Sequence, residues 1–175
     1  MHQKLPIEID PFRLAKQGLI LEGKLSLSTM PRLADVLENT DADIDVKMHF
    51  DINAILGTPT MVGRFKGALP LICERCSQEM SFELDVHCKL AIMNVEKSIE
   101  GLAEEYDPWV IENSDPVLLR SIVEEELILA IPLVPKHKHS CLPAEAWFAK
   151  GNIEEEKIEK KVSPFAVLSD LKLKD

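Results

Sequence analysis

Two short motifs in this sequence have the residue types and the spacing of a metal site. Cys73 and Cys76 are separated by two residues, and His137 and Cys141 by three, with His139 between them. Two thiolates three positions apart on a tight turn can bind one tetrahedral ion, which gives half of a zinc site. If the second motif supplies the other half, the result is a closed Cys3His centre. Such a centre is structural, because no coordination position stays open.

The Cys73–Cys76 pair has two other interpretations. A redox pair of the thioredoxin type has the same spacing, but it normally lies at the N-terminus of a helix, where the helix dipole lowers the thiol pKa. The pair could also be two small apolar residues in a loop that bind nothing. Because it falls between two segments that alternate like antiparallel strands, we favour a zinc knuckle. A further cysteine, Cys88, belongs to the apolar side of its predicted strand and is expected to be a core thiol.

The elements that must position these motifs are predicted from hydrophobic periodicity. Residues 43–52 alternate between apolar and polar side chains, and residues 80–92 do the same, as in strands with one face in a core and one in water. Residues 60–68 are the strand returning from the first of these. Since 80–92 is long for one strand, we expect a bulge or a bend in it.

The helices and the N-terminus complete the predicted fold. Helices are expected over residues 31–38 and from Asp115 to Ala130, the second with a proline at its first helical position. Residues 5–14 are expected to be extended, because their two prolines disfavour a helix. The predicted fold class is therefore α+β: a meandering antiparallel β-sheet, open or barrel-like, with a few packed helices.

One carboxylate interrupts the apolar stripe of the second helix. At about 100° per residue, Glu126 falls at about 80° from Leu118, between Ile122 and Leu119. A charge inside that stripe is costly unless it is paired. Arg75, inside the cysteine turn, is the predicted partner in a structural ion pair. The alternative is that the helix is rotated and Glu126 reaches solvent.

Composition and charge exclude several classes of protein. The chain has 175 residues, of which 46% are hydrophobic, and carries 20 Lys+Arg against 30 Asp+Glu for a formal net charge of −10. No segment reaches the roughly 18 apolar residues of a membrane span, and the start lacks the pattern of a secretory signal, so we expect a cytoplasmic protein with reduced thiols. No nucleotide, hydrolase or metalloprotease motif is found. We therefore expect neither catalysis nor a small-molecule substrate.

The end of the chain differs in composition from the rest. Residues 1–150 are predicted to form a single α+β domain, and residues 151–163 a charged linker. Residues 164–175 are predicted to be an apolar docking segment for a partner. The alternative is that this segment folds back and covers an edge of the sheet. The residues expected to bind the partner are Pro164, Phe165, Leu168 and Leu171.

Four blocks of sequence carry a resemblance to a known family. They are ICERC at 72–76, VEEELILAIP at 123–132, VPKH at 134–137 followed by Cys141, and PFAVLSDLK at 164–172. In order and spacing the chain resembles the YceD family, the large ribosomal RNA subunit accumulation proteins, along essentially its whole length. One departure is Ser163, where the family usually has Asn. The resemblance implies a role in the synthesis, processing or stability of 23S ribosomal RNA without a known enzymatic activity.

The resemblance also bears on the metal and on the partner. Other branches of the family have a cysteine at the position of His137, an exchange that a zinc site tolerates. We therefore expect a ribosome biogenesis factor with a structural zinc that binds a component of the large-subunit precursor. A basic ribosomal protein is favoured over 23S rRNA, because the field of an acidic chain repels phosphates. The alternatives are direct rRNA binding through the cysteine turn and Lys136–Lys138, or an RNA-processing hydrolase.

Overall fold

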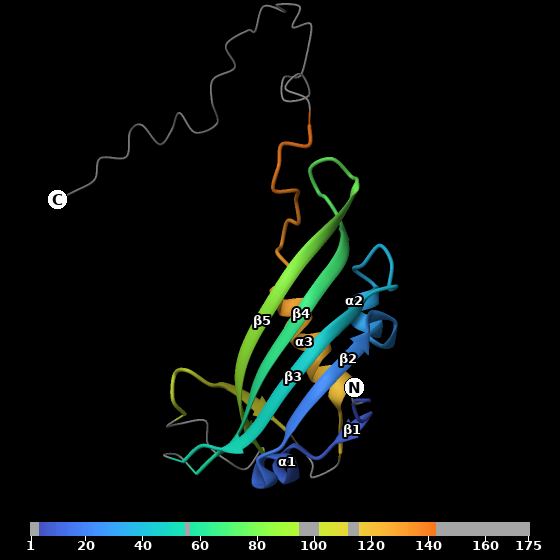
Figure 1. Cartoon of the computed structure of the whole chain (residues 1–175). Coiled ribbons are helices and arrows are strands. Elements are labelled where there is room, and N and C mark those ends of the chain that lie inside the picture. Colours follow the sequence, from blue (N-terminus) through green and yellow to red (C-terminus); the bar gives the residue numbers. More distant parts are fainter. Residues whose placement is uncertain (1–3, 55–56, 95–101, 112–115, 143–175) are drawn as a thin grey trace, which may run out of the picture. The chain divides into compact units, whose positions relative to one another are not determined.

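Figure 1 shows the protein as a computed structural model, which describes residues 4–54, 57–94, 102–111 and 116–142. The chain divides into two units, Met1–Cys141 and Leu142–Asp175, and the elements described here belong to the first. The predicted linker and docking segment, with Pro164, Phe165, Leu168 and Leu171, lie outside the described residues. In chain order the elements are β1 (Glu8–Ile9), α1 (Pro11–Gln17), β2 (Ile20–Ser26), the 3-10 helix η1 (Leu27–Thr29), α2 (Pro31–Ala34), β3 (Asp43–Ile52), β4 (Pro59–Ile72), β5 (Glu79–Met93), β6 (Asp107–Val110), β7 (Val117–Leu118) and α3 (Leu119–Ala130).

The central feature is a five-stranded sheet in the order β2-β3-β4-β5-β6. Strands β2 to β5 form an antiparallel meander, which confirms the predicted α+β class. Strand β6 is parallel to β5. The sheet is not closed into a barrel in the described residues, since β2 and β6 are its edges. Helix α3 instead lies against one face of the sheet (Figure 1).

Strands β4 and β5 form the longest pairing in the sheet. Their register runs without a slip from Thr60↔Ala91 to Ile72↔Glu79, so the expected bulge is absent. The pairing of β3 with β4 ends earlier, at Asp45↔Lys66. The remaining parts of the hairpin, residues 67–72 and 79–84, therefore continue beyond β3 as a two-stranded extension, which we call the arm.

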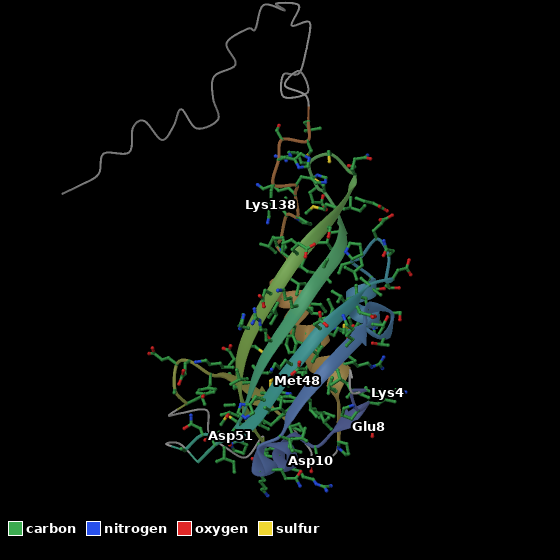
Figure 2. All side chains as sticks on the ribbon, in the orientation of Figure 1. Lys4, Glu8, Asp10, Met48, Asp51 and Lys138 are labelled. Atoms are coloured by element: carbon green, nitrogen blue, oxygen red, sulfur yellow. The ribbon has the colours of Figure 1, made fainter. Side chains whose placement is uncertain are left out.

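The two faces of the sheet follow the predicted alternation. On β3, Met48 is fully buried while Asp51 is exposed (Figure 2). The inner face forms the core together with α3 and the N-terminal elements. Cys88 is 7% exposed in this core, as expected for a core thiol, and burial followed by the nearby charge of Glu126 raises its pKa to about 12. Its Sγ would lie only 2.6 Å from a Cβ added at Gly63, so the neighbouring strand needs a glycine there.

The helices differ from the predicted ones in part of their bounds, although α2 begins at Pro31 as predicted. Residues 11–17 are helical rather than extended, because Asp10 Oδ1 accepts a hydrogen bond from Arg13 N at 3.0 Å and caps the helix. Pro11 then occupies the first position, where a proline is tolerated. Helix α2 is shorter than the predicted 31–38. Helix α3 starts at Leu119 rather than near Asp115, since β7 precedes it and pairs with β1.

Helix α3 is rotated relative to the predicted stripe, of which Leu119 and Val123 are buried as expected. Its buried residues are Leu119, Val123, Leu127 and Glu124, whereas Leu129, which by helical periodicity falls about 20° from Leu118 on the predicted stripe, is 72% exposed. The helix is rotated because its buried carboxylate has a partner. Glu124 Oε1 accepts a hydrogen bond from Leu33 N at 3.0 Å and so supplies the cap that the N-terminus of α2 lacks from its own sequence. Among the described residues, no helix has the length and the apolar content needed to cross a membrane.

Candidate metal centre

The first half of the centre is the turn at the end of the arm. Cys73 directly follows β4, and its backbone N–H donates to Gln78 O at 2.9 Å. Within the turn, Ser77 N donates to Cys73 O at 2.8 Å, and Ser77 adopts a left-handed conformation with φ of 56°. These bonds fold residues 73–78 tightly enough to bring the thiols of Cys73 and Cys76 to the same side.

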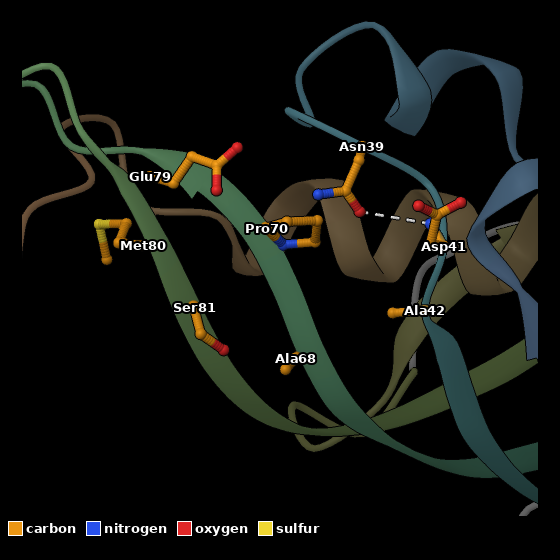
Figure 3. Close-up of a pocket in the computed structure, with 8 residues that line it drawn as sticks. All are labelled: Asn39, Asp41, Ala42, Ala68, Pro70, Glu79, Met80 and Ser81. Carbon is orange, nitrogen blue, oxygen red and sulfur yellow. Dashed lines mark hydrogen bonds between the residues drawn. The ribbon is translucent and has the colours of Figure 1, made fainter.

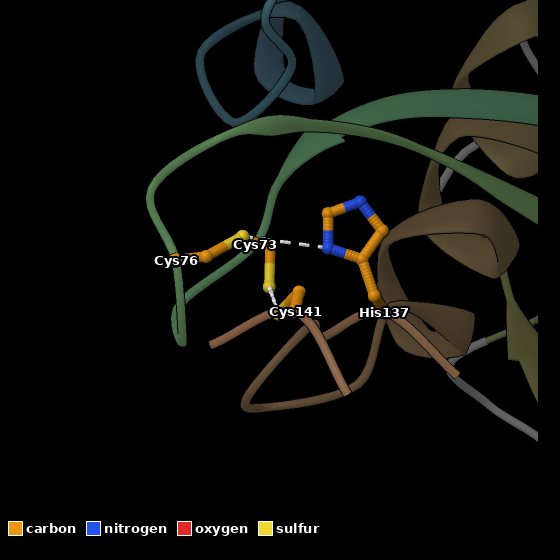
Figure 4. Close-up of side chains that lie close together, drawn as sticks. All are labelled: Cys73, Cys76, His137 and Cys141. Atoms are coloured by element: carbon orange, nitrogen blue, oxygen red, sulfur yellow. Dashed lines mark hydrogen bonds between the residues drawn. The ribbon is translucent and has the colours of Figure 1, made fainter. Parts of the chain in front are cut away.

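The second half comes from the segment after α3. The helix ends at Ala130, and Ile131 is extended, so the chain leaves the helix and runs to the turn. Glu74 N donates to Pro135 O at 2.9 Å, which holds the segment against the turn. His137 and Cys141 then face the two cysteines of the turn (Figure 4).

The four side chains converge on one point, and two of their separations match a tetrahedral metal site. Their ligand atoms all lie within 4.8 Å of one another. Cys73 Sγ is 3.8 Å from Cys141 Sγ, and Cys76 Sγ is 3.5 Å from His137 Nδ1 (Figure 4). Around a tetrahedral zinc ion, two sulfur ligands lie about 3.8 Å apart and a sulfur and a nitrogen ligand about 3.6 Å apart. The residues present therefore fit zinc.

The environment of the ligands favours thiolates at two of the positions. Burial opposes ionisation of the Cys73 thiol, but three backbone N–H groups, the first that of His137, outweigh it and lower its pKa to about 5. Burial also opposes ionisation of Cys141, whose pKa is nevertheless lowered by the guanidinium of Arg75. The pKa of Cys76 is raised, first by burial. The pKa of His137 is raised chiefly by its hydrogen bond with Cys141.

Arg75 supports the centre from outside the ligand set. Its Nε donates to Cys141 Sγ at 2.9 Å, and its Nη2 donates to the carbonyl oxygens of His137, at 3.0 Å, and of His139. The guanidinium thus fixes both ends of the ligand-bearing segment and neutralises a thiolate. The imidazole of His139 lies 4.8 Å from that of His137, centroid to centroid, but it is not one of the four converging ligands.

The structure does not bring the predicted ion pair together. The guanidinium of Arg75 donates its hydrogen bonds to the segment 137–141. Glu126 lies on α3, where burial and the nearby carboxylates of Asp107 and Glu125 raise its pKa. The buried carboxylate of this helix is Glu124, which sequence reasoning missed. No local sequence pattern predicts that Glu124 is buried, because the helix that it caps, α2, lies about 90 residues earlier in the chain.

Together, the fold and the site define a small α+β protein in which a β-hairpin turn and a later segment meet at a group of four side chains that could hold a metal ion. Closed four-ligand centres stabilise structure and leave no position for a substrate.

Comparisons with known proteins identify the family. The family described as "Large ribosomal RNA subunit accumulation protein YceD" matches residues 61–172. A curated protein of that name from Haemophilus influenzae is 30% identical over 173 residues, which is 98% of each chain. No solved structure matches. The chain belongs to the YceD family.

Proposed function

We propose that this protein is a ribosome biogenesis factor that promotes the accumulation of the large ribosomal RNA in the cytoplasm. The observation that carries the proposal is membership of the YceD family along nearly the whole chain, since the family is named for that role. The protein acts by binding a component of the large-subunit precursor and not by catalysis. A closed ligand set supports this, because it has no position for an activated water.

The favoured partner is a basic ribosomal protein. The formal net charge of −10 attracts a cationic protein and repels a phosphate backbone at long range. A protein bound in this way is shielded from premature contact with nucleic acid until it joins the 23S rRNA. Loss of the factor then reduces the rRNA indirectly, because unassembled rRNA is exposed to degradation.

Direct binding of rRNA is the second candidate. It is supported by three exposed cationic or ionisable side chains next to the metal centre, Lys136, Lys138 and His139. Their charge is local and small compared with that of the chain, so direct contact would be confined to this end of the arm.

The metal component of the proposal is a structural zinc held by Cys73, Cys76, His137 and Cys141. Its support is the match of the sulfur–sulfur and sulfur–nitrogen distances to tetrahedral coordination. When bound, the ion ties the turn at the end of the arm to the segment after α3. Freshly purified protein is expected to contain about one zinc per chain. The variant C76S should lose most of it, whereas C88A, which removes a thiol outside the set, should retain it. Equal metal contents of the two variants would contradict this assignment.

The experiment that tests the function uses a tagged full-length copy in living cells. Cells are crosslinked separately with ultraviolet light, which captures RNA, and with a lysine-reactive reagent, which captures proteins, and complexes are treated with RNase before identification. Basic large-subunit proteins that remain bound after RNase support the proposal. Crosslinks to 23S rRNA alone would favour the second candidate. An absence of any large-subunit component would contradict both.

A further inference from the structure

A groove lies beside the arm, next to the candidate metal centre. It separates β4 and β5 of the arm from the loop that precedes β3 (Figure 3), and its volume is about 460 Å³. That volume is enough for several side chains of an extended peptide. The lining residues are Asn39, Asp41 and Ala42 from the loop, Ala68 and Pro70 from β4, and Glu79, Met80 and Ser81 from β5.

The groove exists because the arm continues where β3 no longer pairs with it. Beyond Asp45↔Lys66 the pairing of β4 with β3 ends. Gly67 still lies against Asp43 and Ile44 at the start of β3, but nearer the turn the neighbour of β4 is the loop and not a strand. Glu38 N donates to Pro70 O at 3.0 Å and anchors the loop to the arm at one point. Asn39 Oδ1 accepts a hydrogen bond from Asp41 N at 3.3 Å (Figure 3), which orders the loop beside the opening.

The lining combines an apolar surface with two carboxylates. Ala42, Ala68, Pro70 and Met80 provide the apolar part. Asp41 on the loop and Glu79 on the arm face the same groove from opposite walls, and both residues are exposed. Among the described residues, neither carboxylate has an ion-pair or hydrogen-bond partner, and no lysine or arginine lines the groove.

A second hollow, on the outer face of the sheet, provides a useful contrast. It also contains two acidic residues, Glu22 and Asp45. There, however, Lys47 Nζ lies 3.1 Å from Glu22 and Lys24 Nζ 2.9 Å from Asp45, so the protein neutralises its own carboxylates. Among the described residues, the groove beside the arm has no such internal counterions, so its two carboxylates are available to a cationic partner.

We propose that this groove binds an extended, lysine- or arginine-rich segment of a large-subunit ribosomal protein. The inference rests on the proposed function and specifies the surface that carries it out. The aliphatic stems of the basic side chains pack on Pro70 and Met80, while their charged ends reach Asp41 and Glu79. RNA is excluded from this surface by the same two carboxylates, which would lie against its phosphates.

The test uses the full-length, zinc-loaded protein and the proteins extracted from purified large ribosomal subunits, freed of RNA. A carbodiimide, which joins a carboxylate directly to a lysine amine that contacts it, is applied to the wild-type protein, and the joined peptides are sequenced by mass spectrometry. The proposal expects Asp41 or Glu79 to be linked to lysines of an identified large-subunit protein. Links made only at other carboxylates would overturn it.

Paired variants then separate local docking from long-range attraction. The variant D41K/E79K changes the groove, and the control E8K/E104K changes two exposed carboxylates elsewhere, which likewise have no partner among the described residues. Each double substitution raises the formal net charge by four, from −10 to −6. The groove variant is expected to weaken the dissociation constant for the identified protein by about tenfold or more, and the control by less than about threefold.

The outcomes distinguish this inference from the proposed function. Equal weakening by both variants would overturn the groove while leaving a ribosomal protein as the partner. Binding of 23S rRNA fragments in place of any protein would overturn the groove and the favoured partner together. Binding of no large-subunit component would contradict the proposed function itself. Unchanged zinc content and circular dichroism of both variants ensure that the comparison concerns folded protein.

Discussion

Removing the metal should release residues 132–142 from the arm without unfolding the rest of the protein. None of these residues is buried, so the hydrophobic core does not hold the segment. Hydrogen bonds that join it to the turn include those from Glu74 N, from the guanidinium of Arg75 and from the backbone N–H of His137 to the Cys73 thiol.

The size of the effect follows from comparing two free energies: the cost of ordering the backbone of residues 132–142 and the gain from the hydrogen bonds that hold them. Fixing the backbone costs about 1–2 kcal/mol per residue, or more than about 10 kcal/mol for the segment. The hydrogen bonds from Glu74 and Arg75 return about 0.5–3 kcal/mol each, with the charged donor at the upper end. Together these bonds at most match the lower end of the cost, whereas structural zinc in small domains contributes about 10–16 kcal/mol at neutral pH. The metal is therefore expected to be what keeps the segment ordered.

Hydrogen exchange followed by mass spectrometry measures this directly. After chelation, the amides of Glu74 and His137, which donate across the junction to Pro135 O and to the Cys73 thiol, should exchange at least about 100-fold faster, which corresponds to about 2.7 kcal/mol of lost protection. A peptide covering residues 45–66 of β3 and β4 should be unchanged, and the C88A variant should respond like the wild-type protein. If the metal is shown to be gone and these two amides keep their protection, the reasoning is refuted.

Three further predictions concern the fold around the site. Glu124→Ala should lower the free energy of unfolding by about 1–3 kcal/mol, because an amide of α2 loses its buried acceptor, while Glu124→Gln should cost less than half as much in a urea titration. Gly63→Ala should cost about 1–3 kcal/mol through overpacking, and a double-mutant cycle should show partial relief in combination with Cys88→Ala; strict additivity would argue against the contact. The pKa of Asp85 is lowered to about 2, first by its hydrogen bond from Arg64, so the stability contributed by the pair is present above the unfolded value near 3.8 and is lost as the pH falls towards 2. Arg64→Met should return the Asp85 pKa towards 3.8 in an NMR titration, and an unchanged value would show that Arg64 is not the cause.

The strands and the candidate ligands were the most predictable features. The period of two in residues 43–52 and 80–92 depends only on one buried and one solvated face, and β3 begins and ends at the predicted residues. The ligand pairs are local motifs as well. The sequence alone did not predict the role of Arg75. Its contacts with Cys141 and with two carbonyl groups depend on where the segment 137–141 lies in the fold.

The errors arose where a tertiary contact overrides a local signal. Asp10 and Pro11 carry the same cap-and-proline pattern as Asp115 and Pro116, and only the first pair begins a helix. After the second pair the chain first makes the short strand β7, because β1 is available to pair with it. Similarly, the apolar stripe of α3 predicts the buried Leu119 and Val123 but not the rotation that exposes Leu129. Hydrophobicity alone carries no information on the hydrogen bond that makes burial of Glu124 favourable.

The uninterrupted register of the arm limits how the chain can change in length during evolution. Side chains alternate with a period of two, so inserting one residue between Gly67 and Ile72 would move Cys73 to the opposite face of the arm. Cys73 would then be separated from the other three candidate ligands. Inserting two residues in each strand would preserve the faces and carry the turn about 7 Å further out. The segment after α3 would then have to lengthen by the same reach. Insertions and deletions in relatives should therefore be even-numbered and matched across the arm, or confined to loops such as the one between β3 and β4.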